Sequence, residues 1–317
     1  MAAILRTAYG EILAELGKEN KKFVVFVADT GSGTGAGAFI KKFPERSFNF
    51  GIAEQNMFSA AAGFSTVGIM PFVNTYGVFA TCRVADQVRN SICYPKFNVK
   101  IVASHVGIDA GSDGASHQSV EDLAIMRAIP NIIVLVPADV VELESMLRFL
   151  LKYKGPAYMR TSRTEAIPVN KQSYKYQLGK VPVLENGSDV TIIATGVMVF
   201  RAIKAGKILE KEGISAEIIN CSTLKPLDGE TIVNSARKTG CVVTVEDHNI
   251  INGMGSAVSE LLAKKCPTVT EFIGIKDHFG ESGDIDELYI KYGMSEKHIV
   301  EAAKRVIQKK ENTHEQA

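Results

Sequence analysis

The sequence predicts an α/β protein with two doubly wound domains. Short runs rich in Val and Ile alternate with longer amphipathic segments through the chain, which is typical of a parallel sheet covered by helices on both faces. The alternation stops once, at residues 168–182, where polar residues, prolines and Gly179 follow no hydrophobic period. A chain of 317 residues is long enough for two domains. We therefore predict a first domain at 1–167, a linker at 168–182 and a smaller second domain at 183–317.

The first domain is expected to begin with a helix over residues 2–18, because apolar side chains recur there every four positions. These side chains are Ile4, Ala8, Ile12 and Leu16. Continuous apolar runs predict strands that are buried on both faces. The strands are expected at residues 24–28, 100–104, 132–136 and 157–160, and the helices that follow at residues 58–64, 121–129 and 140–153.

The second domain repeats the alternation but carries fewer chemically distinctive residues. Its strands are expected at 190–194, 216–219, 241–245 and 268–272, and its helices at 198–212, 229–238, 255–265 and 296–307. Two polar segments, Glu246–Asn249 and Asp277–Gly283, are interpreted as interdomain or structural loops in preference to catalytic ones. The polar tail at residues 309–317 is expected to be frayed.

The composition excludes several classes of function. The 36 basic and 35 acidic side chains leave a formal net charge of +1, so we expect no nucleic-acid partner. No apolar run reaches the length of a membrane span, and the N-terminus lacks the plan of a signal peptide. The five cysteines form no CxxC pair, which favours reduced thiols in a cytoplasmic protein over disulfides or a zinc site.

A glycine-rich turn at residues 31–37 follows the first predicted strand. Its spacing partly matches a dinucleotide-binding fingerprint, with Glu54 as the acidic residue. That fingerprint needs a full helix whose N-terminus faces the pyrophosphate. Only residues 38–43 remain here before Pro44, which is too short for such a helix. We therefore favour a flexible loop near a ligand over a nicotinamide site.

Glu54 lies at a predicted strand-to-helix junction. The apolar run before it ends at Phe50, Gly51 permits a tight turn, and a helix of small residues follows. A carboxylate in such apolar surroundings is desolvated and needs a partner or a proton. Either it faces the positive end of the helix dipole, or it hydrogen-bonds a ring nitrogen of a buried cofactor. The local sequence leaves both interpretations open.

Tyr76 and Phe79 are three residues apart. On a helical turn they would project from one face. Such a pair is usually part of the core, and the functional alternative is a platform on which a flat heterocycle stacks.

A long glycine-rich loop at residues 105–118 follows another predicted strand, at the strand end where α/β folds build ligand sites. It contains His105, Asp109, Asp113 and His117. The wide gap between the two histidines and the lack of a clustered third ligand argue against a metal site, and we predict no metal ligands. A substrate-lining loop with a histidine as proton donor is favoured.

The chain resembles transketolases and the related deoxyxylulose-phosphate synthases in their pyrimidine-binding signature, Phe48-Asn-Phe-Gly-Ile-Ala-Glu-Gln-Asn-Met57. The resemblance continues in order, with compatible spacings, over nearly the whole chain. The further matching segments are Thr75–Tyr76, Phe79, Ser104–His105, Asp113–Gly114, Ser116–Gln118, Arg160–Arg163, Val245–Asn249 and Phe279–Gly283.

This resemblance implies the C-terminal subunit of a split transketolase, with a pyrimidine-binding domain followed by a transketolase C-terminal-type domain. A transketolase also has an N-terminal domain that binds the diphosphate and metal of thiamine diphosphate through a Gly-Asp-Gly motif. That motif occurs nowhere in this sequence. We therefore expect an N-terminal partner subunit that holds the diphosphate and Mg²⁺ (or Ca²⁺), in an α2β2 assembly.

The resemblance also implies the reaction and the residues that carry it. A two-carbon ketol unit would pass from a ketose or ketose phosphate to an aldose or aldose phosphate, as in pentose phosphate metabolism. Glu54 would activate the aminopyrimidine ring of the cofactor, and the other ring contacts would come from Tyr76, Phe79 and Ile52.

The substrate contacts follow from the same resemblance. His117 and His105 would line the substrate channel, with His117 near the donor carbonyl, and Asp113 would contact a substrate hydroxyl. Arg6 and Arg163 match family positions that grip the sugar phosphate, where a guanidinium suits the oxygens.

The chain departs from the family pattern at three positions. Cys82 takes the place of a third aromatic residue, and Ser112 takes that of a Glu. Gly33 aligns with a serine that contacts phosphate, and Ser32 lies beside it. The identity of the sugar therefore stays open. A deoxyxylulose-phosphate synthase-like subunit, which would release carbon dioxide from pyruvate, and a non-catalytic binding module of the same fold are the alternatives.

Overall fold

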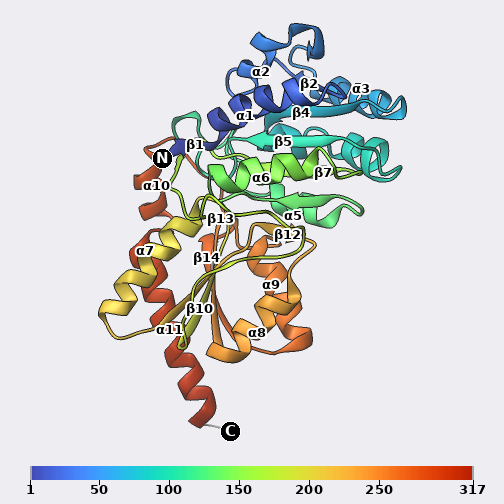
Figure 1. The fold of residues 1–317 in the computed structure, drawn as a ribbon. Helices are drawn as coiled ribbons and strands as arrows, with labels where there is room; N and C mark the ends of the chain where they lie inside the picture. The colour runs from blue at the N-terminus through green and yellow to red at the C-terminus, as the bar shows by residue number, and fades with distance from the viewer. Residues whose placement is uncertain (1, 316–317) are drawn as a thin grey trace.

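The computed structural model describes residues 2–315 and consists of two α/β halves, each built on its own main sheet (Figure 1). The N-terminal half is blue to green in Figure 1, and the C-terminal half is yellow to red. Buried apolar clusters lie on both faces of the first sheet. The predicted fold class is confirmed.

The first sheet has seven strands in the order β12-β6-β7-β5-β4-β2-β3. Six of them pair in parallel, and β12, which comes from later in the chain, pairs antiparallel with β6. The bounds are β2 Phe23–Val27, β3 Ser47–Asn49, β4 Met70–Tyr76, β5 Lys100–Ser104, β6 Ile133–Leu135, β7 Ala157–Arg160 and β12 Thr223–Lys225. All of β2 and β5 is buried, as their apolar runs predict.

Helices follow the strands of the first half. They are α1 Leu5–Glu19, α2 Gly37–Lys42, α3 Glu54–Thr66, α4 Gly77–Thr81, α5 Asp122–Ala128 and α6 Val140–Leu150. Short 3-10 helices occupy Pro44–Arg46 and Gly111–Asp113, and a π-helix occupies Gln87–Cys93.

The buried face of α1 differs from the predicted stripe. It is made chiefly by Leu5, Ala8, Tyr9, Leu13 and Leu16. Ile4 is 38% exposed and lies in the short strand β1 (Ala3–Ile4), which pairs with β8 (Glu165–Ala166). The prediction was wrong at Ile4. Apolar residues recur every four positions from Ile4 and also from Leu5, so the sequence alone offers two possible buried faces. Packing against α6 buries the face that contains Leu5.

The second sheet has five strands in the order β14-β13-β10-β11-β9, all parallel except β9. The strands are β9 Val183–Glu185, β10 Val190–Ala194, β11 Ala216–Asn220, β13 Cys241–Asn249 and β14 Val269–Ile275. The helices are α7 Met198–Lys211, α8 Gly229–Thr239, α9 Met254–Lys265, α10 Ile285–Lys291 and α11 Glu296–Glu315. Each predicted strand and helix of this half is present, and all but α11, which runs on past the predicted end at residue 307, lie within a few residues of their expected bounds.

The tail is helical where a frayed end was expected. Helix α11 continues through residues 309–315, and residues 316–317 lie outside the described part of the chain. The Nζ of Lys310 donates to the main-chain oxygens of Asp189 and Thr239 at 3.2 and 3.1 Å. These contacts hold the end of α11 against the second half. They are tertiary contacts, so the polar character of the tail sequence could not predict them.

The residues predicted as a linker contain no helix or strand but pack against the first half. Asp139 Oδ2 accepts the N–H groups of Val169 and Asn170 at 2.8 and 2.7 Å, and the Tyr174 hydroxyl donates to Glu142 at 2.9 Å. The domain boundaries stay a prediction, since β12 follows the linker in the chain and yet completes the first sheet.

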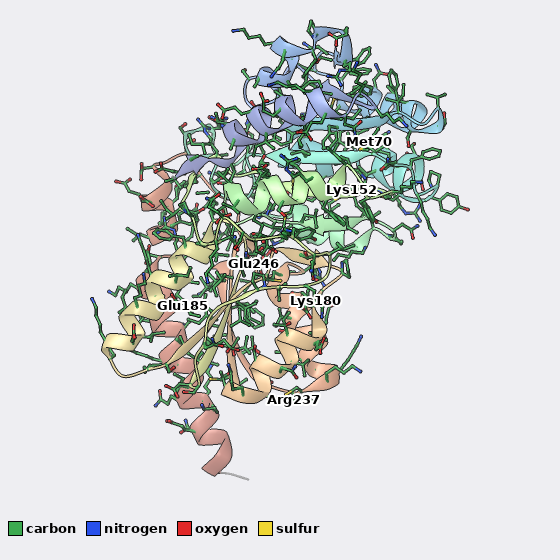
Figure 2. All side chains as sticks on the ribbon, in the orientation of Figure 1. Met70, Lys152, Lys180, Glu185, Arg237 and Glu246 are labelled. Carbon is green, nitrogen blue, oxygen red and sulfur yellow. The ribbon has the colours of Figure 1, made fainter. Side chains whose placement is uncertain are left out.

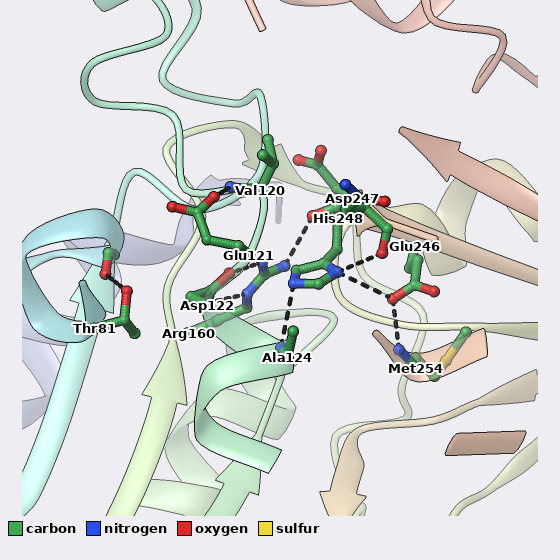
Figure 3. Close-up of polar contacts among 12 residues, drawn as sticks. Thr81, Val120, Glu121, Asp122, Ala124, Arg160, Glu246, Asp247, His248 and Met254 are labelled. Atoms are coloured by element: carbon green, nitrogen blue, oxygen red, sulfur yellow. Dashed lines mark hydrogen bonds and ion pairs between the residues drawn. The ribbon is translucent and has the colours of Figure 1, made fainter. Parts of the chain in front are cut away.

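A buried polar network joins the two halves (Figure 3). Arg160, at the end of β7, pairs with both carboxylate oxygens of Asp122 and donates from Nη1 to the main-chain oxygen of Asp247 at 3.0 Å. His248 Nε2 accepts the N–H of Ala124 at 3.4 Å. The first sheet and the end of β13 are thus held in one arrangement by directional bonds.

The polar segment at residues 246–249, predicted as an interdomain or structural loop, does lie between the halves, but it is the end of strand β13 and largely buried. Figure 2 places Glu246 at this junction. Burial raises the pKa of Glu246 to about 7, although the N–H groups of Met254 and Gly255 donate to it at 2.6 and 2.8 Å. Within residues 2–315, no helix combines the length and apolar character needed to cross a membrane.

Candidate active site

Glu54 is the first residue of α3 and is only 2% exposed. The turn before it contains Gly51 at φ +67°, a conformation that favours glycine. Arg83 Nη1 donates to Glu54 Oε2 at 2.9 Å, and the Arg83 guanidinium carbon lies 3.9 Å from the Phe79 ring centroid. The carboxylate therefore has the charged partner that its burial requires, and that partner lies beside an aromatic ring.

An aromatic wall lies next to this ion pair. Tyr76 is the last residue of β4 and Phe79 lies in α4, so the pair spans a strand end and a helix, where a single helical turn was expected. Their ring centroids are 5.8 Å apart. Tyr76 also packs 3.9 Å from His105, and Phe79 packs 5.4 Å from His117, centroid to centroid. The fold thus brings together two predicted pairs of site residues that are distant in sequence.

His105 follows β5 and is 2% exposed. Its Nδ1 lies 3.0 Å from Ser104 Oγ, and its Nε2 lies 3.5 Å from Asp113 Oδ2. Burial, followed by the charges of Arg6 and Arg163, lowers the pKa of His105 to about 4. The imidazole is therefore neutral near pH 7 and acts as a polar hydrogen-bonding group there.

Two arginines lie on the same side of the loop. Arg163 Nη1 donates to Asp113 Oδ2 at 2.7 Å and to the main-chain oxygen of Ala110 at 2.9 Å. Arg6 Nη1 donates to the main-chain oxygen of Gly33 at 2.8 Å. Burial and the neighbouring Arg163 charge lower the pKa of Arg6. The positive charges of Arg6 and Arg163 favour binding of an anion in this part of the site.

The charge of Asp113 is stabilised by these cations. Partial burial acts to raise its pKa, but the hydrogen bond and charge of Arg163, with smaller contributions from His105 and His117, lower it overall. Asp113 therefore stays ionised and holds the Arg163 side chain at the mouth of the loop.

The glycine-rich turn is explained by packing. A Cβ at Gly33 would lie 2.2 Å from the Tyr76 hydroxyl, and one at Gly35, whose φ is +82°, would lie 1.7 Å from the main-chain oxygen of Arg6. The helix that follows has only six residues, as its sequence predicts, so it lacks the crossover of a dinucleotide site. Ser32 lies in this turn and lines a groove together with Phe48 and Asn49.

Sequence reasoning missed Arg83, because its pairing with Glu54 spans 29 residues of chain. It also missed Asp247, whose carboxylate reaches the loop at residues 105–118 from the second half. No local pattern around either residue signals the contact.

The family comparisons match both halves. Residues 2–167 match the family described as "Transketolase, pyrimidine binding domain", and residues 179–299 match "Transketolase, C-terminal domain". The chain therefore belongs to the transketolase family.

More particularly, the chain is similar to transketolase subunits of about its own length. It is 47% identical over 307 residues to a transketolase C-terminal section from Methanocaldococcus jannaschii, covering 96% of this chain and 95% of that protein. It is 40% identical to a 6-deoxy-6-sulfo-D-fructose transketolase subunit from Clostridium sp., with the same coverages. A 1-deoxy-D-xylulose-5-phosphate synthase from Desulfitobacterium hafniense is 36% identical, but the match spans 47% of that enzyme.

Solved structures agree with these relatives. An inactive β4 tetramer of a split-gene transketolase superposes with a TM-score of 0.90 at 46% identity, covering 96% of this chain and 98% of that one. A transketolase from Campylobacter jejuni superposes with a TM-score of 0.79 at 25% identity, covering 94% of this chain and 46% of that one. The chain is thus similar over its length to the C-terminal section of a split transketolase.

Proposed function

We propose that this chain is the catalytic C-terminal subunit of a thiamine diphosphate-dependent transketolase, which transfers a two-carbon ketol unit from a ketose phosphate to an aldose phosphate. The observation that carries the proposal is the buried Glu54 carboxylate beside Tyr76 and Phe79 in a chain of this family. The loop with His105, Asp113 and His117 borders the same aromatic wall.

The residues fit the aminopyrimidine ring of thiamine diphosphate. A flat heterocycle needs apolar faces and one polar edge. The Phe79 ring stacks with the planar Arg83 guanidinium, which shows that a flat group fits against it. Glu54 supplies a buried acceptor that Arg83 already contacts, and Ile52, two residues before Glu54, is an apolar side chain that is 79% exposed. The fit supports binding of the ring between Glu54 and the aromatic wall.

When bound, thiamine diphosphate would supply the carbon nucleophile that takes up the ketol unit. Glu54 would hydrogen-bond a ring nitrogen through its carboxylate and hold the shared proton there. Arg83 would exchange its bond to Glu54 for another acceptor when the ring binds. The low accessibility of Glu54 excludes water from this hydrogen bond.

The substrate contacts are proposed from the same geometry. His117 would act near the donor carbonyl, and neutral His105 would donate or accept a hydrogen bond beside it. Asp113 would bind a substrate hydroxyl, and Arg6 and Arg163 would bind the anionic end of the sugar. Ser32, in the adjoining turn, would assist there.

The diphosphate and its metal would be held mainly by an N-terminal partner subunit in an α2β2 assembly. No group of three or more His, Cys, Asp or Glu side chains suited to a metal ion occurs within residues 2–315. Relatives named as a subunit and as a C-terminal section support a divided enzyme. The free thiols of all five cysteines suit a reducing, cytoplasmic compartment.

A second candidate is a deoxyxylulose-phosphate synthase-like subunit, which the 36% identity to such a synthase supports. Turnover by the chain assembled with its N-terminal partner separates the two. We expect ketol transfer from a ketose phosphate without release of carbon dioxide. Carbon dioxide release from pyruvate would favour the synthase, and inactivity of the assembled enzyme towards both substrates would favour a non-catalytic module.

A further inference from the structure

We propose that the second half of the chain positions the substrate-lining loop, with Asp247 and Gln118 as the positioning residues. The substrate loop is residues 105–118, which lie between β5 and α5. This inference rests on the proposed role of that loop in substrate binding. It assigns a part in catalysis to a domain that contributes none of the proposed cofactor or substrate contacts.

The root of the substrate loop is fixed by Asp247, which lies in β13. Asp247 Oδ1 accepts the N–H of Ile108 at 3.0 Å, and Oδ2 accepts the hydroxyl of Tyr289 at 2.9 Å. Gly107 has a φ of +62°, and a Cβ there would lie 2.1 Å from the Asp247 carboxyl carbon. The loop therefore approaches this carboxylate as closely as only glycine allows.

The far end of the loop is held by Gln118, which is 2% exposed. Its Nε2 donates to the main-chain oxygen of Glu281 at 2.9 Å. A Cβ at Gly280 would lie 1.9 Å from Gln118 Oε1. The side-chain amide of Gln118 therefore contacts Gly280 and Glu281 of the second half.

The middle of the loop meets the same segment. A Cβ at Gly114, whose φ is +76°, would lie 2.5 Å from Ser282 Oγ. A Cβ at Gly111 would lie 3.0 Å from Ile285 Cγ1, at the start of α10. The substrate loop thus meets the second half at its root, its middle and its end.

These anchors border the residues proposed to bind substrate. His117 immediately precedes Gln118, and Asp113 immediately precedes Gly114. Asp109 connects the substrate loop to Arg163, because its Oδ2 accepts the main-chain N–H of Arg163 at 2.6 Å. Moving an anchor therefore moves a proposed substrate contact, and a displacement of about 1 Å in a reacting group can cost on the order of 10²-fold in rate.

Gly280→Ala tests the proposal directly. Gly280 has no left-handed backbone angle, so alanine adds only a methyl group that must displace the Gln118 amide. In the full-length chain, we expect faster amide hydrogen exchange over residues 105–118, measured by mass spectrometry. Gly63→Ala is the matched control, since a Cβ there meets nothing within 4 Å.

In the enzyme assembled with its partner, Gly280→Ala should lower kcat for ketol transfer about 10- to 100-fold. The affinity for thiamine diphosphate should stay unchanged, because Glu54, Tyr76 and Phe79 lie outside the loop. Gln118→Ala should produce at least the same exchange and the same loss, because it also removes the bonds of Nε2 to the main-chain oxygens of Ile108 and Gly111. The double variant should be no worse than Gln118→Ala alone, since Gly280→Ala acts through the amide that Gln118→Ala removes.

The outcomes are separable. Unchanged exchange in both Gly280→Ala and Gln118→Ala, or fully additive losses of kcat in the double variant, would overturn the proposal. If Gly280→Ala fails to fold, Gln118→Ala decides alone. Faster exchange in a protein whose wild type transfers no ketol unit would support the positioning contact and overturn the proposed function instead.

Discussion

The fold changes the protonation behaviour of His105. Burial, then Arg6 and Arg163, lower its pKa to about 4. We expect its ring to stay neutral at pH 6, where an unperturbed histidine, with a pKa of about 6.5, is mostly protonated. NMR titration of histidine-labelled protein tests this, with His105→Asn assigning the signal. A midpoint near that of a free histidine would contradict the buried placement.

The same shift predicts a pH dependence of stability. Because the folded pKa is below the unfolded one, the unfolded chain binds more protons between pH of about 4 and about 6.5. The contribution of neutral His105 to the free energy of unfolding is therefore present above this window and lost as the pH falls through it. Glu246 and Asp247, whose pKa values are raised to about 7, change the free energy of unfolding in the opposite direction with pH. The test is therefore the pH dependence of the difference in the free energy of unfolding between wild type and His105→Asn.

Arg6 and Arg163 predict a preference for anionic sugars. Loss of a charge-assisted contact costs about 1.5–3 kcal/mol, so Arg6→Ala and Arg163→Ala should raise KM for a phosphorylated sugar more than for its unphosphorylated counterpart. Steady-state kinetics on such matched pairs checks this, with the exposed Arg148→Ala as control. Equal losses on both sugars would show that the arginines are structural.

Single residues show where sequence reasoning reached its limit. Glu54 could be predicted to need a partner, because a carboxylate among apolar neighbours is costly. The partner, Arg83, could not be predicted, since only the folded turn that follows α4 brings its Nη1 to 2.9 Å from the Glu54 carboxylate. Asp247 accepts the N–H of Ile108, which is 139 residues away in the sequence, and no pattern in either segment predicts this contact.

At the scale of elements, the Arg160–Asp122 pair links β7 to α5 and, through the Asp247 main chain, to β13. Both side chains are almost fully buried. Arg160→Met would leave the Asp122 carboxylate buried and unpaired, which costs about 3–5 kcal/mol. We expect a large fall in the urea midpoint. Arg148→Met, which breaks an exposed pair with Glu144, should change the free energy of unfolding by at most about 0.5 kcal/mol, and an equal shift in both variants would contradict this account.

Most of the buried strands and the long helices could be predicted, because their apolar runs and periods are local signals. Strands β7 and β10 have the predicted bounds. Strand β4, which lies between β5 and β2, was not predicted, because Pro71 and Asn74 interrupt its apolar run. The short strand β12 and the helix α10 were not predicted either, since three and seven residues carry too weak a period. The edge position of β12 arises from its pairing with β6, which is a tertiary contact.

At the scale of the whole molecule, the account predicts that the chain alone binds thiamine diphosphate weakly. Most of the affinity should come from the diphosphate and metal contacts of the partner subunit, because charge-assisted bonds and metal coordination are the strong contacts. Titration calorimetry with Mg²⁺ on the isolated chain, compared with the assembled complex, measures this. Tight, magnesium-dependent binding without a partner would refute the divided enzyme.

The most direct test of the central claim is the exchange of the thiazolium C2 proton of thiamine diphosphate for deuterium in the assembled complex, followed by quenching and NMR. Glu54→Gln keeps the shape of the side chain but cannot supply its charge or hold a shared proton. The account predicts that Glu54→Gln and Glu54→Ala leave the complex assembled and slow this exchange roughly 10²–10⁴-fold, and that excess cofactor does not restore it. Exchange at the wild-type rate in both variants would show that Glu54 is only a carboxylate at the start of a helix.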